Sequence, residues 1–167
     1  GSETTFKHFM LLEHVLLKIK KKYGDRVSFM LISNKLYENK KLGITTTFWN
    51  ADDEINQLSH IDIGIMPLPN DEWSRGKCGF KGLQYMAMEI PCIMSAVGVN
   101  TEIIEHGVNG FLAHNNDEWE EYLTLLIDNS ELRKTIGKQG RKTVEERYSI
   151  DSQKEKYVGI FNELTRF

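Results

Sequence analysis

Short runs of apolar, strand-forming residues alternate with helical segments along most of the chain, and this alternation constrains the fold more than any other feature. The expected strands lie at residues 27–32, 44–49, 61–68, 91–95 and 110–113. The expected helices lie at residues 2–23, 50–58 and 81–89, with a single helical turn at 101–105. Strands that alternate with helices form βαβ units, in which successive strands run parallel. The sequence therefore predicts an α/β domain with helices on both faces of a parallel sheet.

The helices at the two ends of the chain are predicted from apolar residues that recur every three or four positions. In the first helix, which Ser2 or Thr4 can cap, they are Phe9, Leu12, Leu16, Ile19 and Tyr23. Residues 117–167 carry three further stripes: Trp119, Tyr122, Leu123 and Leu126; Leu132 and Ile136; and Tyr157, Ile160, Phe161 and Leu164. Residues 1–167 are therefore predicted to form one domain with a helical C-terminal tail.

Composition and charge argue against several classes of protein. The formal net charge of −3 disfavours a nucleic-acid partner, which needs a basic face. The basic residues at positions 18–22 end the first helix, where cations oppose the helix dipole. Cys78 and Cys92 lack the spacing of a zinc site, and the chain has no glycine-rich dinucleotide motif or P-loop. The sequence therefore gives no reason to expect a metal ion or a cofactor.

Two acidic clusters, at residues 52–54 and 71–72, are interpreted as helix caps. Paired carboxylates can cleave glycosidic bonds, but adjacent side chains rarely point the same way, and both clusters stand beside helix or turn signals. A ligand site is expected elsewhere, at the carboxyl ends of the strands, where parallel sheets bind their ligands. The loops after Leu68 and Ser95 are placed there.

Several short motifs lie in these two loops and in the sequence around them. Residues 61–113 read IDIGIMPLPNDEWSRGKCGFKGLQYMAMEIPCIMSAVGVNTEIIEHGVNGFLA. The informative pieces are Asp62 to Pro67, Tyr85-Met86-Ala87 with Pro91, Ser95-x-Val97-Gly98, Glu102-Ile103-Ile104, and Gly107 to Leu112. Each piece is weak by itself, but in their order and spacing together they resemble the donor-binding domain of family 4 (group 1) glycosyltransferases.

This resemblance implies a Rossmann-like, three-layer α/β/α domain that is the C-terminal half of a two-domain GT-B enzyme. It implies binding of a nucleotide diphosphate sugar, and transfer of a hexose-type sugar with retention of configuration and without a metal. The acceptor would be held by an N-terminal domain outside this chain, so the domain alone is expected to be inactive. The implied location is cytoplasmic, in some relatives at the inner face of the membrane, with roles in polysaccharide, glycolipid or storage-sugar synthesis.

Three positions depart from the family pattern. The common pair of glutamates, eight positions apart, falls on Gly76 and Gln84, and the glycine of the turn after the helix is Glu89. The loss of the first carboxylate leaves the identity of the sugar open, as the nucleotide and the acceptor are. It also keeps two alternatives open: a degenerate, non-catalytic nucleotide- or protein-binding module, and a sugar-nucleotide epimerase or hydrolase on the same scaffold.

The strongest candidate ligand residues stand at the start of the helix at 81–89. The free N–H groups of a helix N-terminus suit a diphosphate, and Lys81 adds a full positive charge. Gly82 allows the backbone to approach closely. Gln84 lies one turn further on and can bond a ribose hydroxyl with either amide atom. A solvated surface position is the alternative for both side chains.

Two further groups of candidates come from the neighbouring loops. Arg75 and Lys77 either close over the phosphates or belong to a solvated loop, and Trp73 either stacks on a base or anchors that loop. Gly98, Val99 and Asn100 follow a strand, so their amides are expected to point toward the strand ends. Glu102 is expected to hold either the ribose or the loop itself. No residue is assigned as catalytic.

Two further expectations concern the N-terminal and the C-terminal residues. Gly1-Ser2-Glu3-Thr4-Thr5 matches a loop that follows a strand in the resembling family, so the sheet is expected to lack that strand. The resulting gap or edge should lie beside the strand that begins near Val27 or Ile61. The C-terminal apolar stripe is expected to be partly exposed and to promote self-association.

Overall fold

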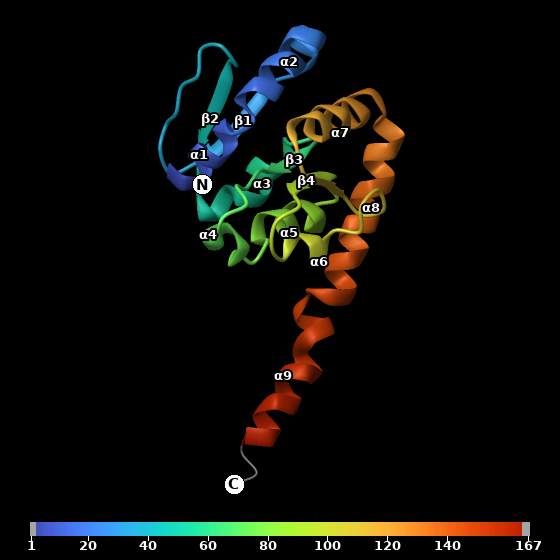
Figure 1. Ribbon diagram of the computed structural model, residues 1–167. Helices are drawn as coiled ribbons and strands as arrows, with labels where there is room; N and C mark the ends of the chain where they lie inside the picture. Colours follow the sequence, from blue (N-terminus) through green and yellow to red (C-terminus); the bar gives the residue numbers. More distant parts are fainter. Residues whose placement is uncertain (1–2, 165–167) are drawn as a thin grey trace.

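The computed structural model describes residues 3–164 of the chain (Figure 1). The strands are β1 (Phe29–Ser33), β2 (Ile44–Phe48), β3 (Gly64–Met66), β4 (Cys92–Ser95) and β5 (Phe111–Ala113). The helices are α1 (Glu3–Met10), α2 (Glu13–Tyr23), α3 (Glu54–Ser59), α4 (Glu72–Arg75), α5 (Phe80–Ala87), α6 (Asn100–Ile103), α7 (Asn116–Asp128), α8 (Ser130–Arg147) and α9 (Ile150–Leu164). Two short 3₁₀ helices, Gly24–Arg26 and Ala51–Asp53, precede β1 and α3.

All paired strands are parallel, as the sequence predicts. β1 pairs with β2, with Phe29 opposite Ile44, and β4 pairs with both β3 and β5. The four residues of β4 are buried, which fits a central strand covered on both faces. The expectation of one five-stranded sheet is wrong in one respect, because the strands form two sheets, β1-β2 and β3-β4-β5.

Helices cover both faces of the strands and complete the three layers. α2 packs beside α7 on one face, and α5 packs beside α8 on the other. The predicted stripe of the N-terminal helices is buried here, with Leu12, Leu16 and Ile19 each at most 2% exposed. On the opposite face, Met86 of α5 is fully buried against Met94 of β4 and its neighbours. This burial of apolar area is the main stabilising contribution to the fold.

The break between the two sheets lies where the missing strand was expected, beside β1 and β3. Two adjoining cavities of about 380 Å³ each occupy it. Residues 26–30 line one side and residues 60–63 line the other, while Phe9 and Tyr85 are shared by both cavities. We call this space the interstrand slot. It separates β1 from β3 along their length, so the expectation of a gap beside the strands near Val27 and Ile61 is confirmed.

Local structure departs from the sequence prediction at three places. The first predicted helix is divided at Leu11 and Leu12, whose N–H groups bond three residues back, to His8 and Phe9. β3 is shorter than predicted because Ile61 still bonds to Leu58 at the end of α3. The loop at 70–80 contains the short helix α4. The predicted cap at Ser2 and the Gly1-Ser2 loop lie outside the described residues.

The acidic clusters serve as helix starts, as predicted. Asp71 accepts a hydrogen bond from the N–H of Ser74 at 2.7 Å and so caps α4. Asp52 and Asp53 lie in the 3₁₀ helix before α3, where Asn50 accepts from the N–H of Asp52 at 3.1 Å. Within the described residues, no hydrogen bond or ion pair brings two carboxylates of either cluster together.

The turn after α5 places a non-glycine residue in the left-handed conformation. Glu89 has φ of 58°, and the next residue, Ile90, bonds back to the carbonyl of Tyr85 at 2.9 Å. This is a helix C-terminal motif in which glycine is the usual residue, because a Cβ atom crowds the backbone there. The left-handed backbone therefore explains the glycine of the family pattern at this position, and this chain has Glu89 in place of that glycine.

We expect Glu89→Gly to stabilise the domain by about 0.5 to 1 kcal/mol, since glycine relieves the left-handed strain but is more flexible when unfolded. The free energy of unfolding in urea measures the change. Glu89→Ala is the control, because it removes the charge and keeps the strain, and it should leave the stability nearly unchanged. An equal gain from both substitutions would show that charge, not conformation, is responsible.

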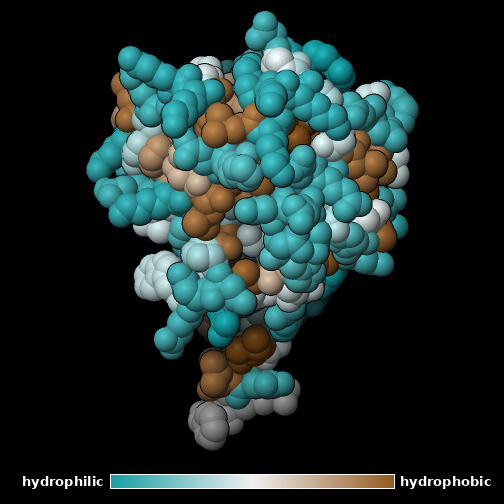
Figure 2. Space-filling view, turned by 45° about the horizontal axis from the view of Figure 1, so that its top comes forward, coloured by the Kyte–Doolittle hydropathy of each residue, from teal (hydrophilic) through white to brown (hydrophobic). Residues whose placement is uncertain are grey.

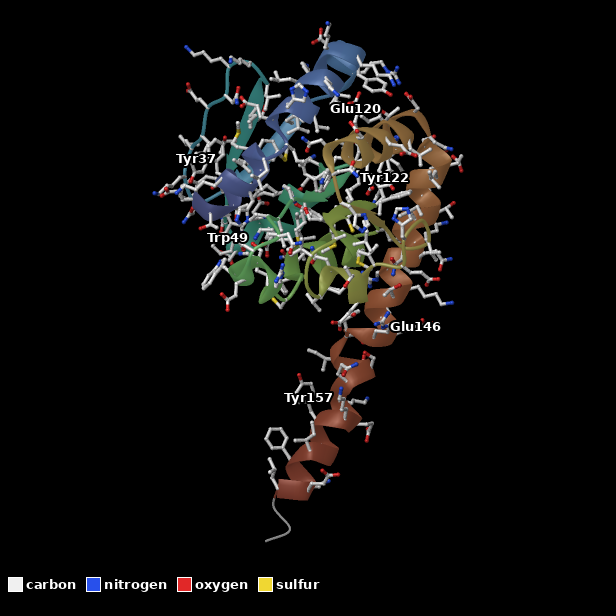
Figure 3. All side chains as sticks on the ribbon, in the orientation of Figure 1. Tyr37, Trp49, Glu120, Tyr122, Glu146 and Tyr157 are labelled. Carbon is white, nitrogen blue, oxygen red and sulfur yellow. The ribbon has the colours of Figure 1, made fainter. Side chains whose placement is uncertain are left out.

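The C-terminal helix α9 extends away from the body of the domain (Figure 1). It has no buried residue, and its apolar residues include Tyr157, Ile160 and Leu164, which are 61%, 46% and 64% exposed. Figure 2 shows this apolar surface at the lower end of the molecule, and Figure 3 shows Tyr157 projecting from the helix. None of the helices within residues 3–164 is both long and apolar enough to cross a membrane.

We expect the exposed stripe of α9 to drive concentration-dependent association of this chain, because water is excluded when such surfaces meet. Sedimentation velocity over a range of concentrations measures it. Ile160→Glu, at the centre of the stripe, should shift the population to monomer, whereas Lys156→Glu on the same helix should not. A wild-type chain that stays monomeric at every concentration would contradict this expectation.

Candidate functional site

One half of the interstrand slot opens at the carboxyl ends of the strands, where parallel sheets bind ligands. This cavity of about 380 Å³ is lined by Lys77, Lys81 and Gln84, which the sequence analysis selected. It is also lined by Thr5 and His8 of α1, by Trp49 after β2, and by Glu54 and Leu58 of α3. We call it the donor cavity, after the ligand that the family resemblance implies. Residues from distant parts of the chain therefore meet in one site.

The start of α5 presents backbone donors to this side of the domain. Gly79, the residue before the helix, has φ of 69°, and a Cβ atom there would collide with the side chain of Ile103. Only glycine fits this turn without movement of its neighbours. Gly79 has no side chain to accept from the first N–H groups of α5, so these donors retain their capacity to bind an anion.

Two ammonium groups add charge to the helix start. Lys81 lies in the first turn of α5, and Lys77 precedes it in the loop, with its Nζ atom 5.9 Å from the ring of Trp73. Loss of hydration around the Lys81 ammonium and then the charge of Lys77 lower the pKa of Lys81. Within residues 3–164 neither lysine forms an ion pair. An anion between them would relieve this repulsion.

Gln84 lies one helical turn beyond Lys81 and is half-buried in the wall of the donor cavity. Its amide can donate or accept a hydrogen bond, so it can meet either role of a hydroxyl group. On the opposite wall, Trp49 donates a hydrogen bond from Nε1 to Glu54 at 2.9 Å (Figure 3). This pair is not part of the predicted site.

The other predicted residues do not line the donor cavity. Arg75 donates from Nε to Asn70 at 2.9 Å, and its backbone lies against Gly98, where a Cβ atom would be 2.6 Å from the Arg75 carbonyl oxygen. Gly98 has φ of 55°, so both its conformation and its contact require glycine. The loop that begins at Gly98 therefore packs on α4, and Val99 beside it is half-buried.

The remaining predicted residues contact other parts of the domain. Asn100 is 1% exposed and donates to the carbonyl of Ser95 at 2.9 Å. Glu102 is exposed, and its backbone carbonyl accepts from Arg147 at 3.2 Å. Gly82 faces the core, where a Cβ atom would lie 2.6 Å from Cε of Met94. Its lack of a side chain brings α5 close to β4, and the close approach of a ligand to its backbone stays a prediction.

His8 is the titratable base among the cavity residues that sequence reasoning missed. The sequence offers no local signal for His8, because the motif residues of the site lie far from it in the sequence. Its place in the cavity depends on how α1 packs in the folded domain. Burial, foremost, and then the charges of Lys77 and Lys81 lower the pKa of His8 from its usual 6.5, while Asp71 opposes them. The imidazole and the two lysines line the same cavity.

These features define an α/β domain with a cationic ligand cavity at the carboxyl ends of parallel strands. A family model described as glycosyl transferases group 1 matches residues 33–143. The chain therefore belongs to the group 1 glycosyltransferase family. The match includes β2 to β5, the turn at Glu89 and the cationic start of α5.

Individual relatives support the same assignment. The chain is 27% identical over 146 residues to the N-acetyl-alpha-D-glucosaminyl L-malate synthase of Bacillus anthracis, covering 86% of this chain and 37% of that protein. Across the curated relatives that it matches, the chain spans 21% to 37% of their length.

Solved structures show the fold. The C-terminal domain of the group 1 glycosyl transferase LpcC of Francisella tularensis has a TM-score of 0.66 at 22% identity, covering 86% of this chain and 82% of that one. Anabaena HepE, solved in complex with UDP-glucose, has a TM-score of 0.69 at 17% identity, covering 90% of this chain and 44% of that one. The fold is thus that of the C-terminal domain of a GT-B glycosyltransferase, with a helical C-terminal tail.

Proposed function

We propose that this domain binds the nucleotide diphosphate sugar of a glycosyl transfer reaction, with the diphosphate at Lys77, Lys81 and the N–H groups of α5. The observation that carries the proposal is the pair of unpaired ammonium groups at an uncapped helix start, at the edge of a ligand cavity. A diphosphate is a dianion with several acceptor oxygens, which this arrangement suits. Gln84, one turn away, is placed to bond a ribose hydroxyl.

The same cations have a chemical role in the transfer. The acceptor oxygen bonds to the anomeric carbon as the bond from that carbon to the diphosphate oxygen breaks, so negative charge grows on the leaving diphosphate. The proton of the acceptor hydroxyl passes to the leaving diphosphate or to solvent. Fixed positive charges at that point stabilise the transition state more than the bound donor. We propose that Lys81 and Lys77 supply this charge in place of a metal ion, and that the configuration of the sugar is retained.

The proposed enzyme needs an acceptor-binding half in addition to this domain. Two observations support this: the chain spans about a third of the length of its curated relatives, and the structure of the Francisella relative that it resembles is itself a C-terminal domain. HepE, whose fold is similar, binds UDP-glucose, which makes a nucleotide sugar the first ligand to test. We therefore propose that the domain by itself binds the donor and does not turn it over.

A non-catalytic module is the second candidate function. It is favoured by the absence of the family carboxylates, since Gly76 and Gln84 stand at their positions. Such a module would bind a nucleotide or a protein without transferring a sugar.

Turnover separates the candidates. A protein that contains this domain and an acceptor domain is incubated with UDP-, GDP- and ADP-sugars, with and without acceptor, and the products are analysed. We expect release of a nucleoside diphosphate only when an acceptor is consumed. Release without an acceptor would indicate a hydrolase, a changed sugar would indicate an epimerase, and the absence of turnover with bound donor would favour the non-catalytic module.

A further inference from the structure

The donor cavity contains a titratable group that the proposed diphosphate site does not use. His8 of α1 is half-buried in the cavity wall, on the same cavity as Lys77 and Lys81. The start of α1 and helix α4 lie at the same end of the domain in Figure 1. An imidazole at this position can change between the neutral and the cationic form near neutral pH, whereas the two lysines stay charged there.

The charged groups that face His8 come from each neighbouring segment. Lys77 belongs to the loop before α5, Lys81 belongs to α5, and Asp71 caps α4. The two cations and the burial of the ring disfavour the imidazolium form, and the carboxylate of Asp71 only partly offsets them. Glu54 of α3 lines the same cavity. At neutral pH and without a ligand, the ring is therefore mainly neutral. The free site therefore lacks the positive charge that protonation of His8 would add.

A bound diphosphate reverses this balance. Its two negative charges would neutralise the field of Lys77 and Lys81 and attract a proton to the imidazole. We propose that His8 is the third cation of the diphosphate site and that the domain takes up at most one proton from solvent at His8 as it binds a nucleotide diphosphate sugar. This rests on the proposed function, because the ligand is the same donor.

The sign of the pH effect follows from linkage. The complex binds more protons than the free domain, so donor affinity rises as pH falls from above the pKa of His8 in the complex to below its pKa in the free domain. Each unit between the two values changes the affinity by about tenfold. Tyr85 and Asp71 titrate outside this window, because burial raises the pKa of Tyr85 to about 12 and a hydrogen bond from the N–H of Ser74 lowers the pKa of Asp71.

NMR titration of the histidine ring signals gives the direct test. The pKa of His8 is measured in the free chain and with a saturating sugar nucleotide, taken as the tightest binder among UDP-glucose, GDP-glucose and ADP-glucose. These diesters lack the terminal phosphate monoester of a nucleoside diphosphate, whose second pKa lies near 6 and would confuse the result. We expect the pKa of His8 to lie below 6.5 in the free chain and to rise by about one unit or more in the complex.

Calorimetry with variants supplies a second readout. Titrations at pH 7 in buffers of different ionisation enthalpy count the protons that are taken up. Wild type should take up a fraction of one proton, and His8→Gln should take up none and bind about tenfold more weakly at low pH. His8→Lys keeps a fixed charge, so its affinity should not depend on pH over this window. His14→Gln, on the exposed face of α2, is the control and should behave as wild type.

The outcomes separate this proposal from the proposed function. A sugar nucleotide that binds at Lys81 with a pH-independent affinity and an unchanged pKa of His8 would overturn the role of His8 and leave donor binding intact. Proton uptake that persists in His8→Gln would assign it to another group and overturn the role as well. If no sugar nucleotide binds to the wild-type chain, the proposed function itself fails.

Discussion

Replacing Gly137 with alanine is expected to destabilise the domain by about 3 kcal/mol, the upper end of the usual cost of overpacking. Gly137 lies in α8, where a Cβ atom would collide with the carbonyl oxygen of Glu89 and lie 2.8 Å from the carbonyl carbon. Both partners are backbone, and the turn at Glu89 is already fixed in the left-handed conformation. α8 and α5 would therefore have to move apart, with loss of the packing between them.

Urea unfolding measures this effect, and Gly159→Ala supplies the matched control. Gly159 also lies within a helix, α9, but a Cβ atom there has no neighbour within 4 Å. The same substitution should therefore leave the stability unchanged or raise helix stability by up to about 1 kcal/mol. If Gly137→Ala were as stable as wild type, the close contact between α8 and the α5 turn would not exist in solution.

Lys81→Ala is expected to weaken the binding of a nucleotide diphosphate sugar by about 1.5 to 3 kcal/mol, the range for a hydrogen bond to a charged group. Lys81 lies in the first turn of α5, so its ammonium group and the free N–H groups of that turn act on the same phosphate. Lys77→Ala should cost less, because that lysine lies in the loop and is also placed over the ring of Trp73.

Titration calorimetry of the two variants against wild type gives the comparison. Lys138→Ala, which removes a lysine from the exposed face of α8, should have no effect on binding. If Lys77→Ala abolished binding while Lys81→Ala left the affinity unchanged, the diphosphate would lie nearer the loop than we place it. The proposed function would survive that result, but the position of the ligand would not.

The parts of the fold that follow from local residue patterns could be predicted from the sequence. Threonine- and aromatic-rich residues at 44–48 indicated β2, and the spacing from Phe9 to Tyr23 indicated the buried face of α1 and α2. The break between these helices could not be predicted, because no glycine or proline marks Leu11 and Leu12. Its position is set by packing, in which Leu12 is buried and Leu11 is half-exposed.

The candidate site divides in the same way. Lys81 and Gln84 belong to one helical motif, and Lys77 precedes them in the adjoining loop, so local patterns placed all three close together. Whether the Gly98 loop joins them at the strand ends depends on the geometry of two chain segments, and the structure shows that loop against Arg75. His8 joins the site from the other end of the chain through tertiary contacts, which no single-sequence pattern reports. The unusual backbone at Glu89 was visible only as a missing glycine.

The central claim is that the donor cavity binds a nucleotide diphosphate sugar, and titration of the wild-type chain tests it most directly. Calorimetry and NMR chemical-shift mapping with UDP, GDP, ADP and their sugars are the measurements. We predict weak but saturable binding of at least one of them, with shifts centred on Lys77, Lys81 and Gln84. The account would be contradicted by the absence of heat and of any shift change with all of these ligands at millimolar concentration.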